Sequence, residues 1–422
     1  MFSAVANTVV GGAGATAARG VLAVTRRLGG TALPTRLAVR CASNAAAAPS
    51  LHGLLGDDAD VTVASVKEYY GKVLKASSDL KTSACTSIAA PAPMVAEALK
   101  KVPKGVSERF YGCGVPLPLG IDGLHVLDLG SGSGRDCYVA AALVGPSGSV
   151  TGIDMTAEQL DVARAHVDEY AETLGWRPNL KFVEGQIEHI ADAGVADGSV
   201  DLVISNCVVN LSPAKDAVLR GAYNALRDGG EMYFSDVYAS RRLPREAVQH
   251  EVLWGECLAG ALYTGDFVRL CRDVGFTDPR VLSTEKIEVT DPELADVCGE
   301  AQFYSITYRL FKLPAGVLET ECEDYGQVAV YNGGIPGHRH RYELDDHHVF
   351  EAGRPMLVCG NTASMVGETW LSPYFTVHGD RSTHFGLFDC GPAPGSAAPS
   401  AASASAGACD VGGSVLGGGS CC

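Results

Sequence analysis

The sequence has few basic residues and no long apolar run, and these two absences exclude whole classes of partner. Lys and Arg number 33 against 49 Asp and Glu, which gives a net charge of −16 at pH 7. Nucleic acid is excluded as the main partner because phosphate contacts need clustered Lys and Arg, and no such cluster is present. No stretch reaches the roughly 20 apolar residues of a membrane-spanning helix, so no membrane segment is expected. An acidic surface also favours a neutral or cationic substrate.

Cysteine pairs of the Cys-x-x-Cys type are also missing, although the chain has 14 cysteines. Without such pairs or a finger-like Cys/His spacing, we expect no structural zinc site and no small disulfide scaffold. A loose group of histidines lies beside Asp345 and Asp346 and could be taken for a metal cluster: His338, His340, His347 and His348. Histidines so loosely spaced in a polar loop are usually solvated, so we favour a solvated loop over a permanent metal.

The beginning of the chain, residues 1–55, differs in composition from the rest. Residues 1–50 contain five arginines, no lysine and no acidic residue. Such a leader resembles an organellar transit peptide, which indicates a mitochondrion or a chloroplast. The alternative is a disordered low-complexity tail, and the protein would then be cytoplasmic.

Four further segments follow from the pattern of the remaining chain. Residues 60–240 carry most of the alternating strands and helices, and 241–320 continues with helices and strand-like stretches. Residues 321–390 are rich in His, Gly and aromatic residues and predict a small C-terminal module. Residues 391–422 are Gly, Ala, Ser and Pro with a terminal Cys421-Cys422, too poor in apolar side chains to fold.

The apolar periodicity predicts strands and helices in alternation. The strands are expected at 125–129, 149–153, 180–183, 200–205, 231–236, 281–289 and 304–311. The helices are expected from about 61, and at 94–102, 136–144, 157–174, 217–226, 246–261 and 264–274. Alternation at this spacing is typical of an α/β protein with a doubly wound parallel sheet of the Rossmann-like type.

A glycine-rich turn links the first strand of this sheet to its helix. The turn contains Gly130, Gly132 and Gly134, and glycines let a ligand approach the backbone closely. A dinucleotide site is the natural competitor, but its fingerprint is G-x-G-x-x-G, whereas this turn reads G-x-G-x-G and has Arg135 at the next position. Asp154, 20 residues past Gly134 at the end of the second strand, is placed to bind both ribose hydroxyls.

The loop after the third strand supports the same interpretation. Residues 185–188 could frame an adenine edge, and the glycine turn lacks the grip for a pyrophosphate. A ribose acid, an adenine loop and such a turn together predict a site for S-adenosylmethionine.

Four cysteines stand in local contexts that packing alone does not require: Cys85, Cys113, Cys207 and Cys257. For most single cysteines in an α/β protein a buried, inert role is the better interpretation. Cys207 is the exception from its position alone, because it follows the fourth strand at the carboxyl edge, where this fold binds ligands. Cys257 is expected within the helix over 246–261.

Several longer runs resemble those of arsenite methyltransferases. They include YYGKVLK, DLKTSAC, FYGCG, VLDLGSGSGRDCYVAA, VTGIDMT, VISNCVVNL, GGEMYFSDVY and VLWGECLAGALY, spread over residues 66–312. The later runs IPGHRHRYELDDHH, MLVCGNTA, ETWLS and HFGLFDC resemble the C-terminal domain of the algal and animal members. The resemblance implies a methyltransferase domain over 60–240 that binds S-adenosylmethionine and an arsenic-binding domain over 241–320.

The resemblance also implies a role for each matching residue. Cys207 and Cys257 would be the core arsenic ligands, Cys113 the third thiol, and Cys85 the partner that forms a disulfide with Cys113 during turnover. The residues expected to line S-adenosylmethionine are Tyr111, Gly130, Gly132, Gly134, Asp154, Met155, Ile187, Glu188 and Asn206. Arsenite and methylarsenite would be substrates, thioredoxin or glutathione the reductant, and the enzyme a monomer.

The chemistry of arsenic gives an independent reason for such a set of cysteines. Trivalent arsenic is soft and prefers thiolate ligands, and it keeps a lone pair that can attack a sulfonium methyl group. Two other functions stay open at this point. A methyltransferase acting on carbon or oxygen of a small metabolite would not need these cysteines together, and a thiol-rich protein that only sequesters metalloids would not need the glycine turn or Asp154.

Overall fold

The computed structural model of the chain describes residues 91–110, 112 and 115–390. The predicted leader, the predicted helix from residue 61 and the C-terminal tail lie outside these residues. Within the described part, no helix combines the length and the apolar character that a membrane span requires.

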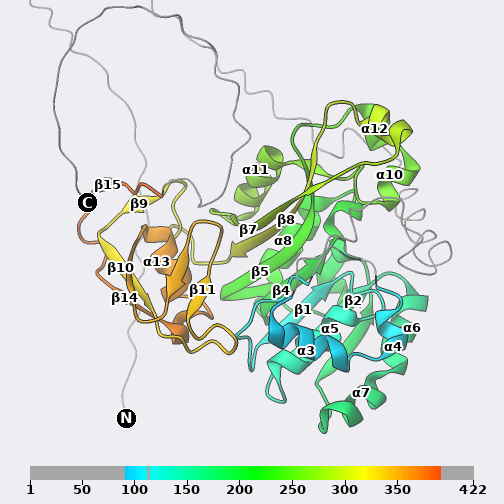
Figure 1. Cartoon of the computed structure of the whole chain (residues 1–422), viewed down its shortest axis with the longest axis horizontal. Coiled ribbons are helices and arrows are strands. Elements are labelled where there is room, and N and C mark those ends of the chain that lie inside the picture. The colour runs from blue at the N-terminus through cyan, green and yellow to red at the C-terminus, as the bar shows by residue number, and fades with distance from the viewer. Residues whose placement is uncertain (1–90, 111, 113–114, 391–422) are drawn as a thin grey trace, which may run out of the picture. The chain divides into compact units, whose positions relative to one another are not determined.

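A single mixed sheet forms the centre of the fold (Figure 1). Its strands are β1 (His125–Leu129), β2 (Ser149–Asp154), β3 (Leu180–Glu184), β4 (Val200–Asn206), β5 (Leu226–Ala239), β6 (Leu262–Tyr263), β7 (Arg280–Ile287) and β8 (Phe303–Phe311). They lie in the order β3-β2-β1-β4-β5-β8-β7, with β6 paired to β5. Strands β1 to β5 are parallel, and β8 is antiparallel to both neighbours. The predicted doubly wound α/β fold is confirmed.

Helices cover both faces of the sheet because successive side chains of a strand point to opposite faces. On β1, Val126 belongs to one hydrophobic core, whereas Leu127 and Leu129 belong to the other. The principal helices are α3 (Pro93–Lys101), α4 (Lys104–Ser107), α5 (Arg135–Val144), α6 (Ala157–Ala165), α7 (Val167–Leu174), α8 (Lys215–Ala225), α11 (Thr264–Val274) and α12 (Pro292–Cys298). Strand β4 is buried at every residue, as expected for a central parallel strand.

Two predicted helices are broken in the structure. The helix expected over 157–174 divides into α6 and α7 at His166, whose φ of −102° and ψ of 2° lie outside the helical region. The helix expected over 246–261 is replaced by α9 (Arg245–Val248) and α10 (Glu251–Gly255). Cys257 lies beyond the end of α10, because its φ of +61° cannot continue a right-handed helix. Its predicted placement within a helix was therefore wrong.

The C-terminal module is built on a small antiparallel sheet. Strand β10 (Gln327–Tyr331) pairs with β13 (Pro355–Val358) and β14 (Phe375–His378), and α13 (Gly360–Gly367) packs against them. Two short pairs complete it: β11 (Arg341–Glu343) with β12 (Val349–Glu351), and β9 (Glu323–Asp324) with β15 (Gly386–Leu387).

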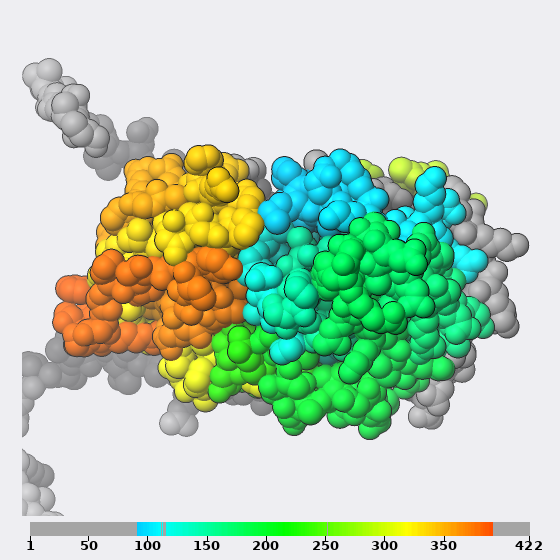
Figure 2. Space-filling view, turned by 90° about the horizontal axis from the view of Figure 1, so that it is seen from below, coloured from blue at the N-terminus to red at the C-terminus, as the bar shows by residue number. Residues whose placement is uncertain are grey.

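A buried ion pair ties this module to the central sheet. Arg309 on β8 binds Glu231 on β5 at 2.6 Å, and both side chains are buried. From the module, the Trp370 indole donates to Glu231 at 2.9 Å and the Tyr342 hydroxyl accepts from Arg309 at 2.8 Å. Figure 2 shows the yellow and orange module against the cyan surface of the first described residues, where the Tyr374 hydroxyl donates to the Gly120 carbonyl at 3.0 Å.

Candidate active site

A cleft opens at the carboxyl ends of β1, β2 and β4. It lies where strand order reverses between β1 and β4, the usual ligand position in this fold. Seven of the predicted cofactor residues line it: Gly130, Gly132, Asp154, Met155, Ile187, Glu188 and Asn206. Gly134 does not line the cleft, and Tyr111 lies outside the described residues.

The glycine turn shapes the floor of this cleft. Gly134 has a φ of +92° and begins α5, and a Cβ atom there would come within 2.7 Å of the Phe182 ring. Gly132 has a φ of +52° and open space around it, since no heavy atom lies within 4 Å of a Cβ placed there. Gly134 therefore serves the close packing of the turn, whereas Gly132 leaves bare backbone facing a ligand.

Asp154 is held at the end of β2 by two backbone amides. The amide of Gly132 donates to one carboxylate oxygen at 2.8 Å, and the amide of Thr156 donates to the other at 2.8 Å. These bonds fix the carboxylate beside the glycine turn, and an ionised carboxylate acts only as an acceptor of hydrogen bonds. The geometry suits the predicted contact with two vicinal hydroxyls.

The Asp136 carboxylate, whose role the sequence did not reveal, holds Asn206 in the cleft wall. The Asn206 amide donates to Asp136 at 2.8 Å, and Arg135 forms an ion pair with the same carboxylate at 2.6 Å. The guanidinium of Arg135 lies 3.0 Å from the centre of the Phe110 ring, and Phe110 itself lines the cleft. Arg135, which follows a glycine turn that lacks the dinucleotide fingerprint, thus packs against an aromatic wall of the site.

A second carboxyl lining the cleft, Asp128, was also missed. It is almost fully buried on β1, and burial, followed by the neighbouring charge of Asp136, raises its pKa to about 8. The Cys137 thiol donates to it at 3.1 Å. The sequence offered only the position of Asp128 before the glycine turn as a signal.

Cys207 and Cys257 come together at one side of the cleft. Cys207 directly follows β4 and lines the cleft, and the thiol of Cys257 donates to the Cys207 carbonyl at 3.2 Å. Among the described residues other than glycine, these two cysteines alone have positive φ, +56° and +61°. Such backbone costs about 1–2 kcal/mol for an L-residue and is often found at functional sites. The structure therefore brings together two predicted arsenic ligands on strained backbone.

Cys207 is disulfide-bonded in this structure. The other cysteines among residues 91–110, 112 and 115–390 are free thiols, so none of them is its partner. A sulfur in a disulfide cannot also bind a metalloid as a thiolate, so ligand binding at Cys207 requires the reduced protein. Cys85 and Cys113, the other two predicted site cysteines, lie outside the described residues.

A buried polar network supports the backbone of the two cysteines. The Asn210 side chain donates to the Cys257 carbonyl at 3.4 Å, and the backbone amide of Asn210 donates to Asp236 at 3.0 Å. Lys215 donates to the carbonyls of Asn210 and Ser212 at 3.1 and 2.8 Å. Burial raises the pKa of Asp236 to about 7 and lowers that of Lys215 to about 8. Sequence reasoning missed this network because Asp236 and Cys257 lie 26 and 47 residues from Asn210.

The four histidines considered as a metal cluster do not converge on one point. His348 is buried and bonded to Asp345, whereas the His338 ring meets the Tyr342 ring edge to face. Of the four, only His347 belongs to a group of potential ligand atoms among the described residues, together with Asp345 and Asp346. The predicted solvated-loop interpretation therefore applies to only part of this segment.

Comparison with known proteins identifies the family of the chain. The family described as "Methyltransferase domain" matches residues 121–277. Arsenite methyltransferase of Aquipseudomonas alcaligenes is 57% identical over 328 residues, which cover 78% of this chain and 94% of that protein. The human arsenite methyltransferase is 43% identical over 314 residues, covering 74% and 82% of the two chains.

Among solved structures, the chain resembles the crystal structure of an arsenic(III) S-adenosylmethionine methyltransferase from Chlamydomonas reinhardtii. The TM-score is 0.69 at 62% identity, and the match covers 71% of this chain and all of that one. The fold, the cleft and these relatives agree with one another. The chain is thus an S-adenosylmethionine-dependent methyltransferase that belongs to the arsenite methyltransferase family.

Proposed function

We propose that this enzyme transfers methyl groups from S-adenosylmethionine to trivalent arsenic while cysteine thiolates hold the arsenic, and that this serves arsenic detoxification. The observation that carries the proposal is the contact between Cys257 and Cys207 beside the Asp154 cleft. A methyltransferase acting on carbon or oxygen would have no use for two strained cysteines at that position. The substrates would be arsenite and its methylated trivalent products.

The residues of the cleft fit the methyl donor. Gly132 offers open backbone, and Asp154 offers a fixed carboxylate for the ribose hydroxyls. Ile187 and Glu188 begin the short 3-10 helix after β3 and line the same cleft, and we assign them to frame the adenine. When bound there, S-adenosylmethionine supplies an electrophilic methyl group on its sulfonium.

The two cysteines would act by holding and orienting the arsenic. Thiolates are the preferred ligands of so soft a centre, and a pyramidal arsenic bound to them keeps its lone pair. Arsenic carries no proton that must be removed, so no general base is required at the site. The contribution of the protein is then mainly proximity and orientation, which reach about 7–11 kcal/mol in favourable cases.

Methylation of trivalent arsenic formally produces pentavalent arsenic, and a dithiol can return the two electrons by closing to a disulfide. We assign this step to Cys85 and Cys113, with Cys113 also serving as the third arsenic ligand. Thioredoxin or glutathione would then reopen the disulfide.

The test is to identify the acceptor of the methyl group. The full chain, reduced beforehand, is incubated with arsenite, glutathione and S-adenosylmethionine labelled in the methyl group, and the arsenic species are then separated by chromatography. We expect the label in methylated arsenic, and only when arsenite is present. Label that appears on a carbon or oxygen acceptor, or bound arsenic that gains no label, would refute the proposal.

A further inference from the structure

Three cysteines outside the methyl-transfer cleft gather in the C-terminal module. The sulfurs of Cys322, Cys359 and Cys390 all lie within 4.8 Å of one another. They come from three separate segments: Cys322 precedes β9, Cys359 caps the N-terminus of α13, and Cys390 follows β15. The pairing of β9 with β15 brings two of them together, and the amide of Phe388 donates to the Cys322 carbonyl at 2.7 Å.

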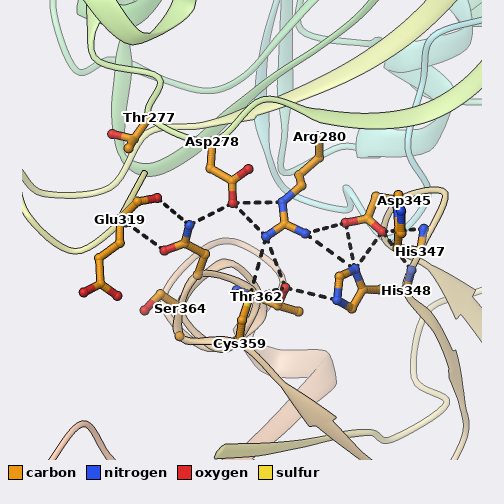
Figure 3. Close-up of polar contacts among 12 residues, drawn as sticks. Thr277, Asp278, Arg280, Glu319, Asp345, His347, His348, Cys359, Thr362 and Ser364 are labelled. Carbon is orange, nitrogen blue, oxygen red and sulfur yellow. Dashed lines mark hydrogen bonds and ion pairs between the residues drawn. The ribbon is translucent and has the colours of Figure 1, made fainter. Parts of the chain in front are cut away.

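The surroundings of Cys359 favour its thiolate form (Figure 3). The Thr362 amide donates to the Cys359 sulfur at 3.4 Å, as expected at a helix N-terminus, and the Thr362 hydroxyl lies 3.3 Å from it. The Arg280 guanidinium approaches the same sulfur at 3.8 Å. Positive charge and converging donors stabilise a thiolate.

Arg280 is itself held rigidly in this position. It donates to Asp278 at 2.7 Å and to Asp345 at 2.9 Å, and Asp345 is bonded to His348 at 2.8 Å. Figure 3 shows the guanidinium between the two carboxylates, with the Cys359–Thr362 turn below it. Since these side chains are buried or nearly so, the cation cannot swing away from the sulfur.

The three sulfurs therefore differ in protonation. A hydrogen bond from Cys322, followed by the charge of Arg280, lowers the pKa of Cys359 to about 5 despite its burial. The pKa of Cys322 is raised, first because it donates to Cys359, and burial raises the pKa of Cys390. Of the three sulfurs, that of Cys359 has the surroundings that most favour a thiolate.

We propose that Cys322, Cys359 and Cys390 form a second binding site for trivalent arsenic, separate from the site of methyl transfer. Three sulfurs converging on one point match the pyramidal trithiolate coordination of a soft centre with a lone pair. Cys359 is fully buried, but Cys322 and Cys390 are only half-buried, so a ligand can enter from their side. The proposal does not depend on methyl transfer.

Binding of arsenous acid to this cluster balances without an oxidant or reductant. Three As–O bonds break and three As–S bonds form, so As(OH)₃ and three thiols give As(SR)₃ and three water molecules. Each of the three thiols gives its proton to one hydroxide that leaves the arsenic, so the leaving groups depart as water. Arsenic stays trivalent throughout.

The donor set is less suited to zinc, a borderline-soft cation that thiolates commonly bind. Structural zinc sites are four-coordinate, and the cluster has no fourth His, Cys, Asp or Glu ligand atom among the residues that the structure describes.

The experiment counts arsenic bound to the reduced full chain. Arsenite is dialysed against a Cys207→Ser chain, which lacks one proposed ligand of the methylation site, and bound arsenic is measured by mass spectrometry. Adding Cys390→Ser should remove about one equivalent of arsenic, and adding Cys322→Ser should do the same. The matched control is Cys271→Ala, which removes a buried free thiol on α11 and should leave the count unchanged.

Three readouts protect the result from misinterpretation. Circular dichroism shows whether each variant folds, and arsenic-edge X-ray absorption should report three As–S bonds in the Cys207→Ser chain and a lower sulfur count after Cys390→Ser. Cys390→Ser in the otherwise unchanged chain should still methylate arsenite, so loss of the second site is distinguishable from loss of the proposed function. An unchanged arsenic count in folded Cys322→Ser and Cys390→Ser chains would overturn the proposal. Zinc bound at the cluster that arsenite cannot displace would overturn it as well.

Discussion

Replacing Cys257 by glycine or alanine measures the backbone strain that the fold maintains at the proposed arsenic site. With a φ of +61°, any residue other than glycine costs about 1–2 kcal/mol there. Cys257→Gly relieves this cost but loses one buried methyl group relative to Cys257→Ala, about 0.8 kcal/mol. The glycine variant should therefore be as stable as the alanine variant or more stable by up to about 1 kcal/mol.

Cys271 gives the matched comparison, in which the alanine variant should be more stable than the glycine variant. It is fully buried within α11, where glycine costs about 1 kcal/mol more than alanine through helix propensity and about 0.8 kcal/mol more through lost burial. Cys271→Gly should therefore be about 2 kcal/mol less stable than Cys271→Ala, and the difference between the two sites should be about 2–3 kcal/mol. Urea unfolding of the four reduced variants measures this difference.

An equal preference for alanine at both positions would refute the argument that Cys257 is strained. Methylation activity is measured in parallel and should be absent from both Cys257 variants, because neither supplies a sulfur. A site at which glycine is tolerated structurally but not functionally is one where the side chain is kept for its chemistry.

Four further predictions concern other parts of the chain. Asp154→Ala should weaken S-adenosylmethionine binding by about 1–3 kcal/mol and leave arsenite binding intact, and calorimetry showing unchanged affinity would contradict its assignment. Burial raises the pKa of Asp128 to about 8, so the stability from its neutral form is complete below the unfolded pKa of about 4 and is lost as pH rises through about 8. Asp128→Asn should flatten this fall in the free energy of unfolding, and an unchanged pH profile would contradict it. Cys85→Ser or Cys113→Ser should block turnover of arsenite but spare monomethylarsenite, which needs only two thiolates; equal loss of both activities would refute the division of roles. Residues 1–50 fused to a fluorescent protein should direct it to a mitochondrion or plastid, and cytosolic fluorescence would refute targeting.

The sheet and the cofactor turn could be predicted from the sequence because their signals are local. Apolar runs mark β1 to β4, and Gly132 and Gly134 lie between a strand and a helix at a fixed spacing. Asp154 followed from the same spacing, and its bond to the Gly132 amide confirms that the two meet. The roles of the glycine turn and of Asp154 could therefore be predicted without knowing which distant residues meet in the tertiary structure.

The missed features depend on residues that only the tertiary structure brings together. The predicted helix through Cys257 fails because the positive φ of Cys257 ends it, and the Cys257 carbonyl then accepts a bond from Asn210, 47 residues earlier. Cys322, Cys359 and Cys390 are 37 and 31 residues apart, a spacing without any motif, so nothing in the sequence joined them. A thiol cluster assembled from three loops becomes visible only after β9 has paired with β15.

The central claim is that arsenic is methylated while Cys207 and Cys257 hold it, and kinetics of two substrates on matched variants test this most directly. Reduced Cys207→Ser, Cys257→Ser and Cys271→Ala chains are each given arsenite or monomethylarsenite with S-adenosylmethionine and glutathione. The account predicts that both serine variants methylate neither substrate, because a hydroxyl is a poor ligand for soft arsenic, while Cys271→Ala methylates both. Either serine variant, folded and methylating monomethylarsenite at the rate of the unchanged enzyme, would contradict the account.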